Sequence, residues 1–433
     1  MWEAIQSNKR KSVVLIGLLA GVLIALGYFA GAAFDPEGGG FGLLTAVGLW
    51  FILMAIAFAG GNRILLATSG AREVTREQAP QLYNIVEEMK IASGLPAMPK
   101  VFIIDSDAPN AFAVGLKPEN SAVAVTTGLL ARLNRDELQG VVAHEIGHIA
   151  NRDTLFMTLA GMTVGAIIIL ADVFLRGMWI SGGRRRSSSS KGGGQAAAIM
   201  AIVAVVLAVI APLLGQILYF ACSRKREYLA DASAAQFTRY PEGLASALEK
   251  ISGYKGAKVQ VSKAVAPMFT VNPLAAAGSS SSVFSTHPPT ADRIQVLRAM
   301  AGGSLAAYDM AFRKLHSDKG VLGARTLAAS KEIEVRPARV QKKVTQAEQL
   351  RAAKDILNQA ARFATIACAC GLRIKLPPGF EEKSVRCPRC GRQHTTPSPE
   401  LLAGAAALQT VRIVHTDDSA DEQPHLHSGG AGR

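Results

Sequence analysis

The chain has 433 residues, of which 49% are hydrophobic and 18% are charged. This composition excludes an ordinary soluble enzyme, indicates membrane segments, and leaves room for two or three domains. The formal charge of +14 does not predict a nucleic-acid partner, because the positive residues are dispersed or flank apolar segments. No cysteine precedes Cys222, and the last four form short couplets, which favours metal binding in a reducing compartment over a secreted disulfide framework.

The first feature is an apolar stretch at residues 12–34, directly after Lys9, Arg10 and Lys11. It is long enough to cross a bilayer at about 1.5 Å per residue, and we interpret it as an uncleaved anchor whose basic flank stays in the cytoplasm. Gly17 with Gly21 and Gly27 with Gly31 are spaced to let a neighbouring helix approach closely. The alternative is that these glycines are ordinary residues of a membrane segment, where glycine is common. Residues 43–60 then return through the membrane.

A second region, residues 63–153, alternates helical and strand patterns. Apolar residues at helical spacing predict an amphipathic helix over 72–94. Two β-rich runs predict strands at 101–105 and 122–126, with residues 110–115 between them. The strand at 122–126 is either an edge that binds an extended peptide or an ordinary core strand.

A helix with candidate metal ligands is predicted at the end of this region. Asn134 and Glu137 have the spacing of a capping box, and His144 and His148 lie four residues apart on one helical face. Both imidazoles can therefore reach one zinc ion, while Glu145 beside them can accept a proton from the attacking water. The pattern also arises by chance, but its apolar neighbours would bury these groups, and buried polar groups need partners.

Two further apolar segments, 154–175 and 196–222, form a candidate membrane hairpin. The link between them, 176–195, carries five positive charges and no negative charge. If the first two helices place residues 63–153 in the cytoplasm, this link emerges on the other side, against the positive-inside tendency. Either the tendency is overridden here or the hairpin does not cross the membrane.

A third metal ligand is sought in the helix that follows. Glu227 and Asp231 are four residues apart, so one could bind zinc while the other accepts a hydrogen bond from the outer nitrogen of a ligating histidine. The alternative is that Glu227 is a surface acid paired with Arg224 or Lys225.

These motifs together resemble the HtpX heat-shock membrane metalloproteases, relatives of the CAAX prenyl proteases. The resemblance covers about residues 10–300 and rests on four ordered motifs, namely 109–113 (PNAFA), 144–148 (HEIGH), 223–231 (SRKREYLAD) and 285–289 (STHPP) with 292–294 (DRI). The resemblance implies one catalytic zinc ion and a set of roles: zinc ligands His144, His148 and Glu227, general base Glu145, oxyanion stabiliser His287, histidine-orienting Asp231, and substrate-binding Asn110, Ala111 and Phe112.

His287 by itself would more often be a loop histidine bonded to backbone, and its motif match is what makes it a catalytic candidate. Beyond it, residues 319–364 have apolar residues at helical spacing and predict a helical linker. The tail at 398–433 is predicted to be disordered, with His425 and His427 as weak metal candidates at most.

The four late cysteines predict a second zinc site. Cys368 and Cys370, then Cys387 and Cys390, are paired knuckles followed by glycines, which resembles a zinc ribbon holding a structural zinc ion through four thiolates. The first couplet has one intervening residue rather than two. A redox pair is the alternative.

We therefore predict a mainly α protein, with integral membrane helices, a gluzincin-like α+β catalytic domain and a small zinc-ribbon-like C-terminal domain. By the resemblance it is a zinc endopeptidase of the inner (plasma) membrane, facing the cytoplasm, in contact with membrane lipid and acting on misfolded membrane proteins. A prenyl-protein-type protease and a non-catalytic adaptor are the alternatives. The predicted segments are an anchor (1–62), the catalytic domain (63–153 and 223–318), a hairpin (154–222), a linker (319–364), the ribbon (365–397) and the tail (398–433).

Overall fold

The computed structural model describes residues 2–35, 37–182, 194–256, 288–300, 303–316, 320–329, 334–340, 344–361, 363–377, 380 and 382–396. The chain divides into two compact units, Met1–Ala360 and Ala361–Arg433. The predicted catalytic residue His287 and the histidines of the tail lie outside the described residues. Most of the first unit is helical, as predicted from the sequence.

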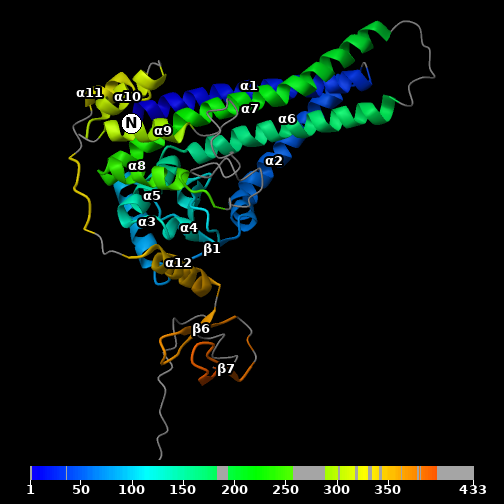
Figure 1. Ribbon diagram of the computed structural model, residues 1–433. Helices are drawn as coiled ribbons and strands as arrows, with labels where there is room; N and C mark the ends of the chain where they lie inside the picture. Colours follow the sequence, from blue (N-terminus) through cyan, green and yellow to red (C-terminus); the bar gives the residue numbers. More distant parts are fainter. Residues whose placement is uncertain are drawn as a thin grey trace, which may run out of the picture. The chain divides into compact units, whose positions relative to one another are not determined.

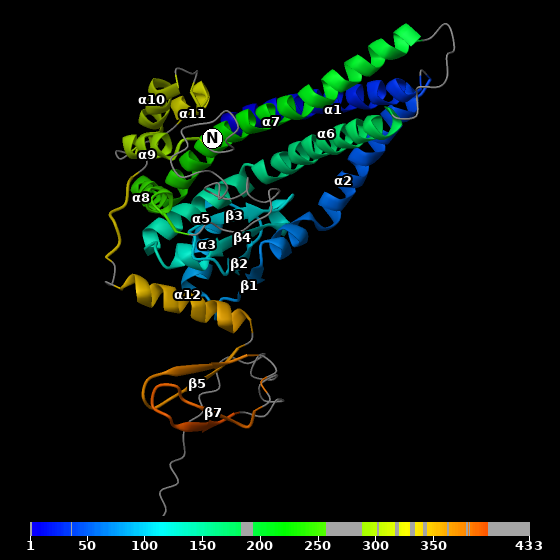
Figure 2. The same cartoon turned by 45° about the vertical axis from the view of Figure 1, so that its right-hand side comes forward.

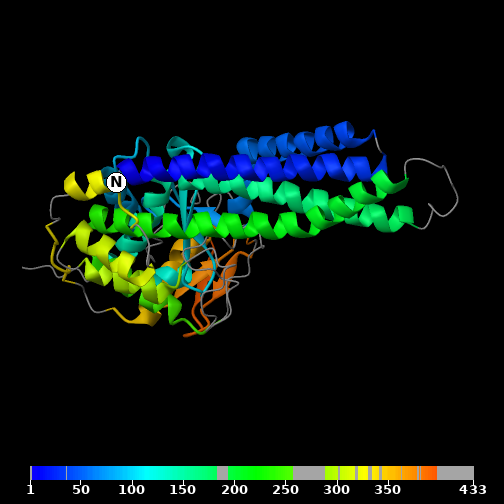
Figure 3. The ribbon, with the colours of Figure 1, turned by 90° about the horizontal axis from the view of Figure 1, so that it is seen from above.

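Four long helices of the first unit lie side by side (Figure 1, Figure 3). They are α1 (Trp2–Phe34), α2 (Gly39–Thr68), α6 (Asp153–Gly182) and α7 (Gly194–Thr238). Within the described residues, three segments are long and apolar enough to cross a membrane: Lys9–Phe34, Gly39–Thr68 and Asp153–Met178. The apolar part of α7, Ala201–Ile217, is shorter.

The bundle follows from which side chains its helices bury. Leu19, Leu26 and Ile167 are fully enclosed between the helices, whereas Leu18 and Ile52 are 56% and 60% exposed on the outside. An apolar exterior of this kind is stable in lipid but not in water. Gly27 and Gly31 do let α1 and α2 meet, because a Cβ atom at either position would collide with the backbone of α2. The prediction is wrong for Gly17 and Gly21, because no described atom of a neighbouring helix lies within 4 Å of a Cβ atom at either position.

A four-stranded sheet with strand order β1-β2-β4-β3 lies beside the bundle. Its strands are β1 (Ala71–Glu73), β2 (Lys100–Ile104), β3 (Ala111–Val114) and β4 (Ala122–Thr126). Only β2 and β4 are parallel; the other neighbours are antiparallel. The prediction of one helix over 72–94 is wrong at its start: residues 71–73 pair with β2, and α3 spans Pro80–Ser93, because proline is tolerated in the first helical turn.

The sheet order also decides between the two interpretations of residues 122–126. β4 pairs with β2 on one side and β3 on the other, so it is a core strand and not an edge. The edge next to helix α5 (Arg135–Ala150) is β3, as Figure 2 shows. The sequence did not predict β3 as a strand, since its four residues are too short a run to show alternation.

The remaining helices of the first unit pack around the sheet, helix α5 and the long helices. They are α4 (Thr127–Leu130), α8 (Pro241–Ser252), α9 (Thr290–Ala299), α10 (Leu305–His316), α11 (Ala324–Ala329) and α12 (Gln346–Ala360), with a 3-10 turn at Pro118–Asn120. Residues 319–364 are therefore not one helical linker: residues 334–340 are non-helical between α11 and α12. Figure 2 shows α12 near β1, on the side of the sheet away from β3.

The second unit contains two antiparallel hairpins, β5 (Ala364–Ala367) with β6 (Arg373–Leu376) and β7 (Ser384–Arg386) with β8 (Gln393–Thr395). Each cysteine couplet occupies the turn of one hairpin. Gly371 and Gly391 end the two turns with positive φ angles of 83° and 72°, which glycine adopts without steric cost.

Candidate zinc sites

Helix α5 is fixed at its start and along its length. The predicted capping box is present: the Asn134 side chain accepts from the Glu137 amide at 2.9 Å, and Glu137 accepts from the Asn134 amide at 2.9 Å. At Gly147, inside the His-Glu-Ile-Gly-His motif, a Cβ atom would lie 3.3 Å from the carbonyl oxygen of Ala230. The motif glycine therefore allows α7 to pack closely, which brings Glu227 to the histidines.

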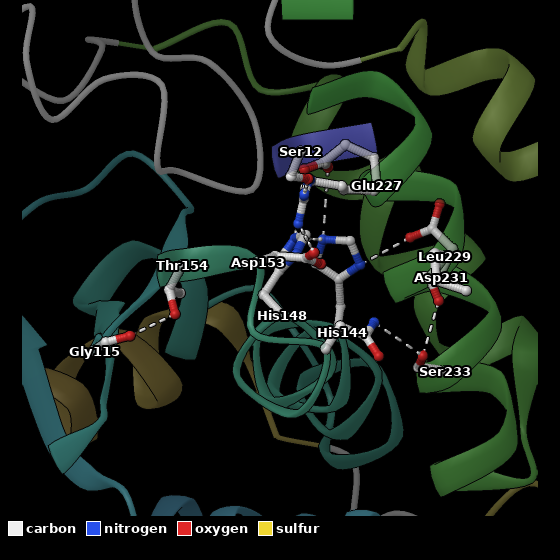
Figure 4. A network of polar contacts seen from close by, with 12 residues as sticks. Ser12, Gly115, His144, His148, Asp153, Thr154, Glu227, Leu229, Asp231 and Ser233 are labelled. Carbon is white, nitrogen blue, oxygen red and sulfur yellow. Dashed lines mark hydrogen bonds and ion pairs between the residues drawn. The ribbon is translucent and has the colours of Figure 1, made fainter. Parts of the chain in front are cut away.

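The three predicted zinc ligands converge (Figure 4). The Nε2 atoms of His144 and His148 are 3.2 Å apart. The Glu227 carboxylate lies 3.6 Å from the first and 3.4 Å from the second. All three side chains are largely or fully buried, and α7 rather than α5 supplies the carboxylate.

Two aspartates hold the outer nitrogens of these histidines. Asp231 lies 2.9 Å from Nδ1 of His144. It therefore accepts the hydrogen bond from the outer nitrogen of a ligating histidine that the sequence predicted for one of the two acids on this helix. Asp153, the first residue of α6, lies 3.1 Å from Nδ1 of His148. Each imidazole is thereby turned so that Nε2 faces Glu227 and can donate its lone pair to a metal.

Each aspartate is in turn held by a buried arginine. Arg293 of α9 donates to both oxygens of Asp231 at 2.8 and 2.7 Å and lies 3.3 Å from Glu227. Arg226 of α7 bonds Asp153 and also the hydroxyl of Ser12 on α1. The site is therefore connected directly to the first membrane helix.

The charges around the site explain the pKa shifts of its histidines. Burial opposes charge on His144, but hydrogen bonds to Asp231 and Glu227 outweigh it and raise its pKa. Burial acts in the same way on His148, and Asp153 with Glu227 raises its pKa well above the usual value. Both shifts report an excess of negative charge near the imidazoles.

A divalent cation fits this donor set in charge and in distance. Four buried carboxylates and two buried arginines surround the site, so Zn²⁺ brings the buried charge to neutrality. A tetrahedral zinc ion with donors at about 2.1 Å separates its ligand atoms by about 3.4 Å, against the 3.2, 3.4 and 3.6 Å found here. The set of carboxylates is Glu145, Asp153, Glu227 and Asp231, and the arginines are Arg226 and Arg293.

The other predicted site residues are placed as follows. Glu145 follows His144 on α5 and is 2% exposed. Ala111 and Phe112 lie in the edge strand β3, and the backbone N–H of Asn110 donates to Thr126 Oγ1 at 2.9 Å. Because β3 packs beside α5, these residues lie along the helix that carries His144 and His148.

The four cysteines of the second unit also gather. Cys368 and Cys390 have sulfurs 3.5 Å apart, and those of Cys370 and Cys387 are 3.7 Å apart. These distances far exceed a disulfide bond of about 2.05 Å and match the separation of about 3.8 Å between sulfurs bound to one tetrahedral zinc at about 2.3 Å. Burial works to raise the pKa of Cys387, but amide hydrogen bonds from Cys390 and Arg389 lower it to about 6. An amide hydrogen bond from Cys370 works to lower the pKa of Cys368, but burial and hydrogen bonds with the other three sulfurs outweigh it and raise this pKa. In the absence of metal, Cys387 is therefore the one of these two thiols that ionises first.

The sequence analysis did not predict that three residues support the zinc ligands, either directly or through the aspartates that orient them. They are Asp153, Arg226 and Arg293. Arg293 and Arg226 had a signal, since they lie in the matched segments 292–294 and 223–231. Asp153 precedes an apolar segment and resembled an ordinary charged end of a membrane helix. Only the packing of α6 against α7 shows that Asp153 and Arg226 meet.

The bundle and the ligand set define a membrane zinc metallopeptidase, and the complete ligand set removes the alternative of a non-catalytic adaptor.

Residues 76–301 match the model of Peptidase family M48. A "Protease HtpX homolog" of Dictyoglomus thermophilum is 45% identical over 299 residues, covering 69% of this chain and 94% of the relative. One of Thermoanaerobacter pseudethanolicus is 42% identical, covering 69% and 98%. The crystal structure of S. mikatae Ste24p is matched at 19% identity with a TM-score of 0.38, covering 69% of this chain and 67% of that chain.

This chain belongs to peptidase family M48, and its relatives are the HtpX-type proteases. The expected family, the enzyme class and the zinc ligands His144, His148 and Glu227 are thereby confirmed. The four cysteines lie beyond residue 301, where the family match ends.

Proposed function

We propose that this peptidase cleaves membrane-embedded and membrane-proximal proteins on the cytoplasmic side of the inner (plasma) membrane, in the quality control of misfolded membrane proteins. The observation that carries the proposal is the continuity of the zinc site with the bundle. Glu227 lies on the same helix as the apolar segment Ala201–Ile217, and Asp153, which holds His148, begins a candidate membrane span. A substrate must therefore come close to the membrane surface to reach the zinc.

The cytoplasmic placement is supported by the contact between Ser12 and Arg226. Ser12 directly follows the basic cluster Lys9–Lys11, so the zinc site and this cluster lie at the same end of α1. Basic clusters beside membrane helices favour the cytoplasmic side. Residues 183–193, the middle of the basic link at 176–195, lie outside the described residues. The five positive charges of that link oppose this orientation.

In the proposed mechanism, Glu145 is the general base. Bound zinc would polarise the scissile carbonyl and lower the pKa of water. Glu145 would accept the proton of the attacking water and pass it to the leaving amine. Asp231 and Asp153 would keep the imidazoles of His144 and His148 in the tautomer that binds metal. His287 would donate a hydrogen bond to the developing oxyanion.

For the substrate, we propose an extended segment that runs along β3. This strand is at the edge of the sheet beside α5, and edge strands accept peptides by adding one more strand. Asn110, Ala111 and Phe112 would then position the scissile bond near Glu145. For the second unit, we propose that its four cysteines hold a structural zinc ion.

The proposal is tested with one target sequence presented in two forms, as a soluble protein and fused to a membrane helix, both offered to the full-length enzyme in liposomes. Faster cleavage of the anchored form is expected, with Glu145→Gln as the inactive control. Equal rates for the two forms would contradict the restriction to membrane-proximal substrates.

His287 has its own test, the substitution His287→Ala. An oxyanion donor predicts that kcat falls about 10²-fold or more while bound zinc and thermal stability hardly change. Lower stability with normal turnover of the folded enzyme would instead make it a structural loop histidine. Loss of zinc would make it a ligand and question Glu227.

A further inference from the structure

A short segment of the C-terminal extension, residues 334–340, contacts both helices that carry the zinc ligands. It lies well beyond residue 301, where the family match ends. The contact is made chiefly by Arg336, whose side chain is 15% exposed. None of the motifs by which the sequence was interpreted includes this arginine.

On one side, Arg336 bonds the first turn of α5. Its Nη2 donates to Asp136 Oδ1 at 2.8 Å and to the side-chain oxygen of Gln139 at 2.8 Å. Asp136 and Gln139 are each 3% exposed. The second carboxylate oxygen of Asp136 accepts the amide of Arg339 at 2.9 Å. An ion pair at such a buried helix start is screened little by water.

On the other side, the same guanidinium holds the end of α7. Arg336 Nε donates to the carbonyl oxygen of Thr238, the last residue of α7, at 3.0 Å, and the Arg336 amide donates to the carbonyl of Arg239 at 3.0 Å. Its guanidinium carbon lies 4.8 Å from the ring centre of Tyr240. The last carbonyls of a helix lack partners within the helix and favour a cation.

The two helices joined in this way supply the three ligands of the catalytic zinc site. His144 lies about 12 Å along α5 from Asp136, and Glu227 about 16 Å along α7 from Thr238, at about 1.5 Å per residue. A rigid helix transmits a shift at its end to its side chains, and ligand geometry tolerates only small shifts. The spacing of α5 and α7 thus sets how Glu227 meets the two histidines.

We propose that Arg336 is a positioning residue of the catalytic zinc site, and that the C-terminal extension through it clamps α5 to α7. The extension is then part of the catalytic unit of this chain and not only the connection to the cysteine-rich unit. Arginine is suited to this role because its planar fork can bond two helices at once, which the single ammonium of lysine cannot do.

The test uses the full-length, zinc-loaded protein in detergent and three variants: Arg336→Ala, Arg336→Lys and Arg339→Ala. Arg339 is the matched control, since its side chain only approaches Glu88 at 3.8 Å and is 39% exposed, while its amide stays in place. Zinc release into a chelator, kcat, KM and melting temperature are measured for each. Release from the cysteine cluster serves as an internal reference.

We expect Arg336→Ala to release catalytic zinc about tenfold faster, the lower end of the effect of losing a group that orients a ligand. The kcat of Arg336→Ala should fall with little change in KM. For Arg336→Lys, zinc release and kcat should lie between those of Arg336→Ala and the unaltered protein. Arg339→Ala should show the zinc release and kcat of the unaltered protein. Unchanged zinc release and kcat with a lower melting temperature would overturn the proposal, as would an equal effect of Arg339→Ala. If Arg336→Ala does not fold, Arg336→Lys decides by the same criteria.

Discussion

Arg226 offers the sharpest test of how the catalytic site is joined to the membrane bundle. Its guanidinium and the Asp153 carboxylate are each 3% exposed, and Arg226 also bonds Ser12 on α1 and packs 5.1 Å from the ring centre of Phe156. Removing one member of a buried ion pair leaves the other charge uncompensated, at a cost of about 3–5 kcal/mol. We expect Arg226→Met to lower the free energy of unfolding by this amount, a large share of the roughly 5–15 kcal/mol typical of a folded protein.

The double variant Arg226→Met/Asp153→Asn separates lost charge from lost packing. Asparagine removes the buried negative charge yet can still accept the hydrogen bond from His148, so the double variant should be more stable than Arg226→Met alone. Denaturant unfolding in detergent at fixed free zinc measures all four members of the cycle, because bound zinc itself adds stability. A loss below about 1 kcal/mol for Arg226→Met, or additive losses in the double variant, would refute the reasoning.

Three further predictions concern the zinc sites. Asp231→Asn should weaken zinc binding about 10- to 100-fold, because Arg293 and His144 lose the carboxylate between them; metal competition measures this, and unchanged affinity would contradict it. Cys390→Ser should lower bound zinc from two ions per chain to one while hydrolysis continues, as counted by elemental analysis, since the two donor sets are separate. Zinc affinity should rise with pH, because zinc binds the neutral imidazoles of His144 and His148. The protonated imidazoles stabilise the metal-free fold, since their pKa values are raised in it. This stabilisation is complete below about pH 6.5, the pKa of an unfolded histidine, and is lost as pH rises through the raised values. Melting temperatures of chelated and zinc-loaded protein across this range should therefore diverge as pH rises.

The two histidine ligands could be predicted from the sequence because their geometry is local: His144 and His148 share a helical face by their spacing alone. The apolar membrane helices are predictable for the same reason, since each is a continuous run. The spacing of Glu227 and Asp231 shows only that they share a face of a second helix, and the choice of Glu227 as the ligand rested on the resemblance.

What the sequence could not predict depends on contacts between distant segments. Asp153 and Arg226 act together only because α6 and α7 pack side by side, and Arg336 reaches Asp136 across the fold. Strand β1 is only three residues long and forms through its pairing with β2. Three residues are too few to show a periodic pattern, so the sequence could not predict this strand.

The central claim, a zinc peptidase whose general base is Glu145, is tested most directly by Glu145→Gln. Glutamine is nearly isosteric with glutamate but cannot take the proton of the attacking water. The measurement is peptide hydrolysis by the variant in detergent, with zinc counted in the same sample. The account predicts full zinc content and no measurable turnover. Substantial turnover by the zinc-loaded variant would contradict it.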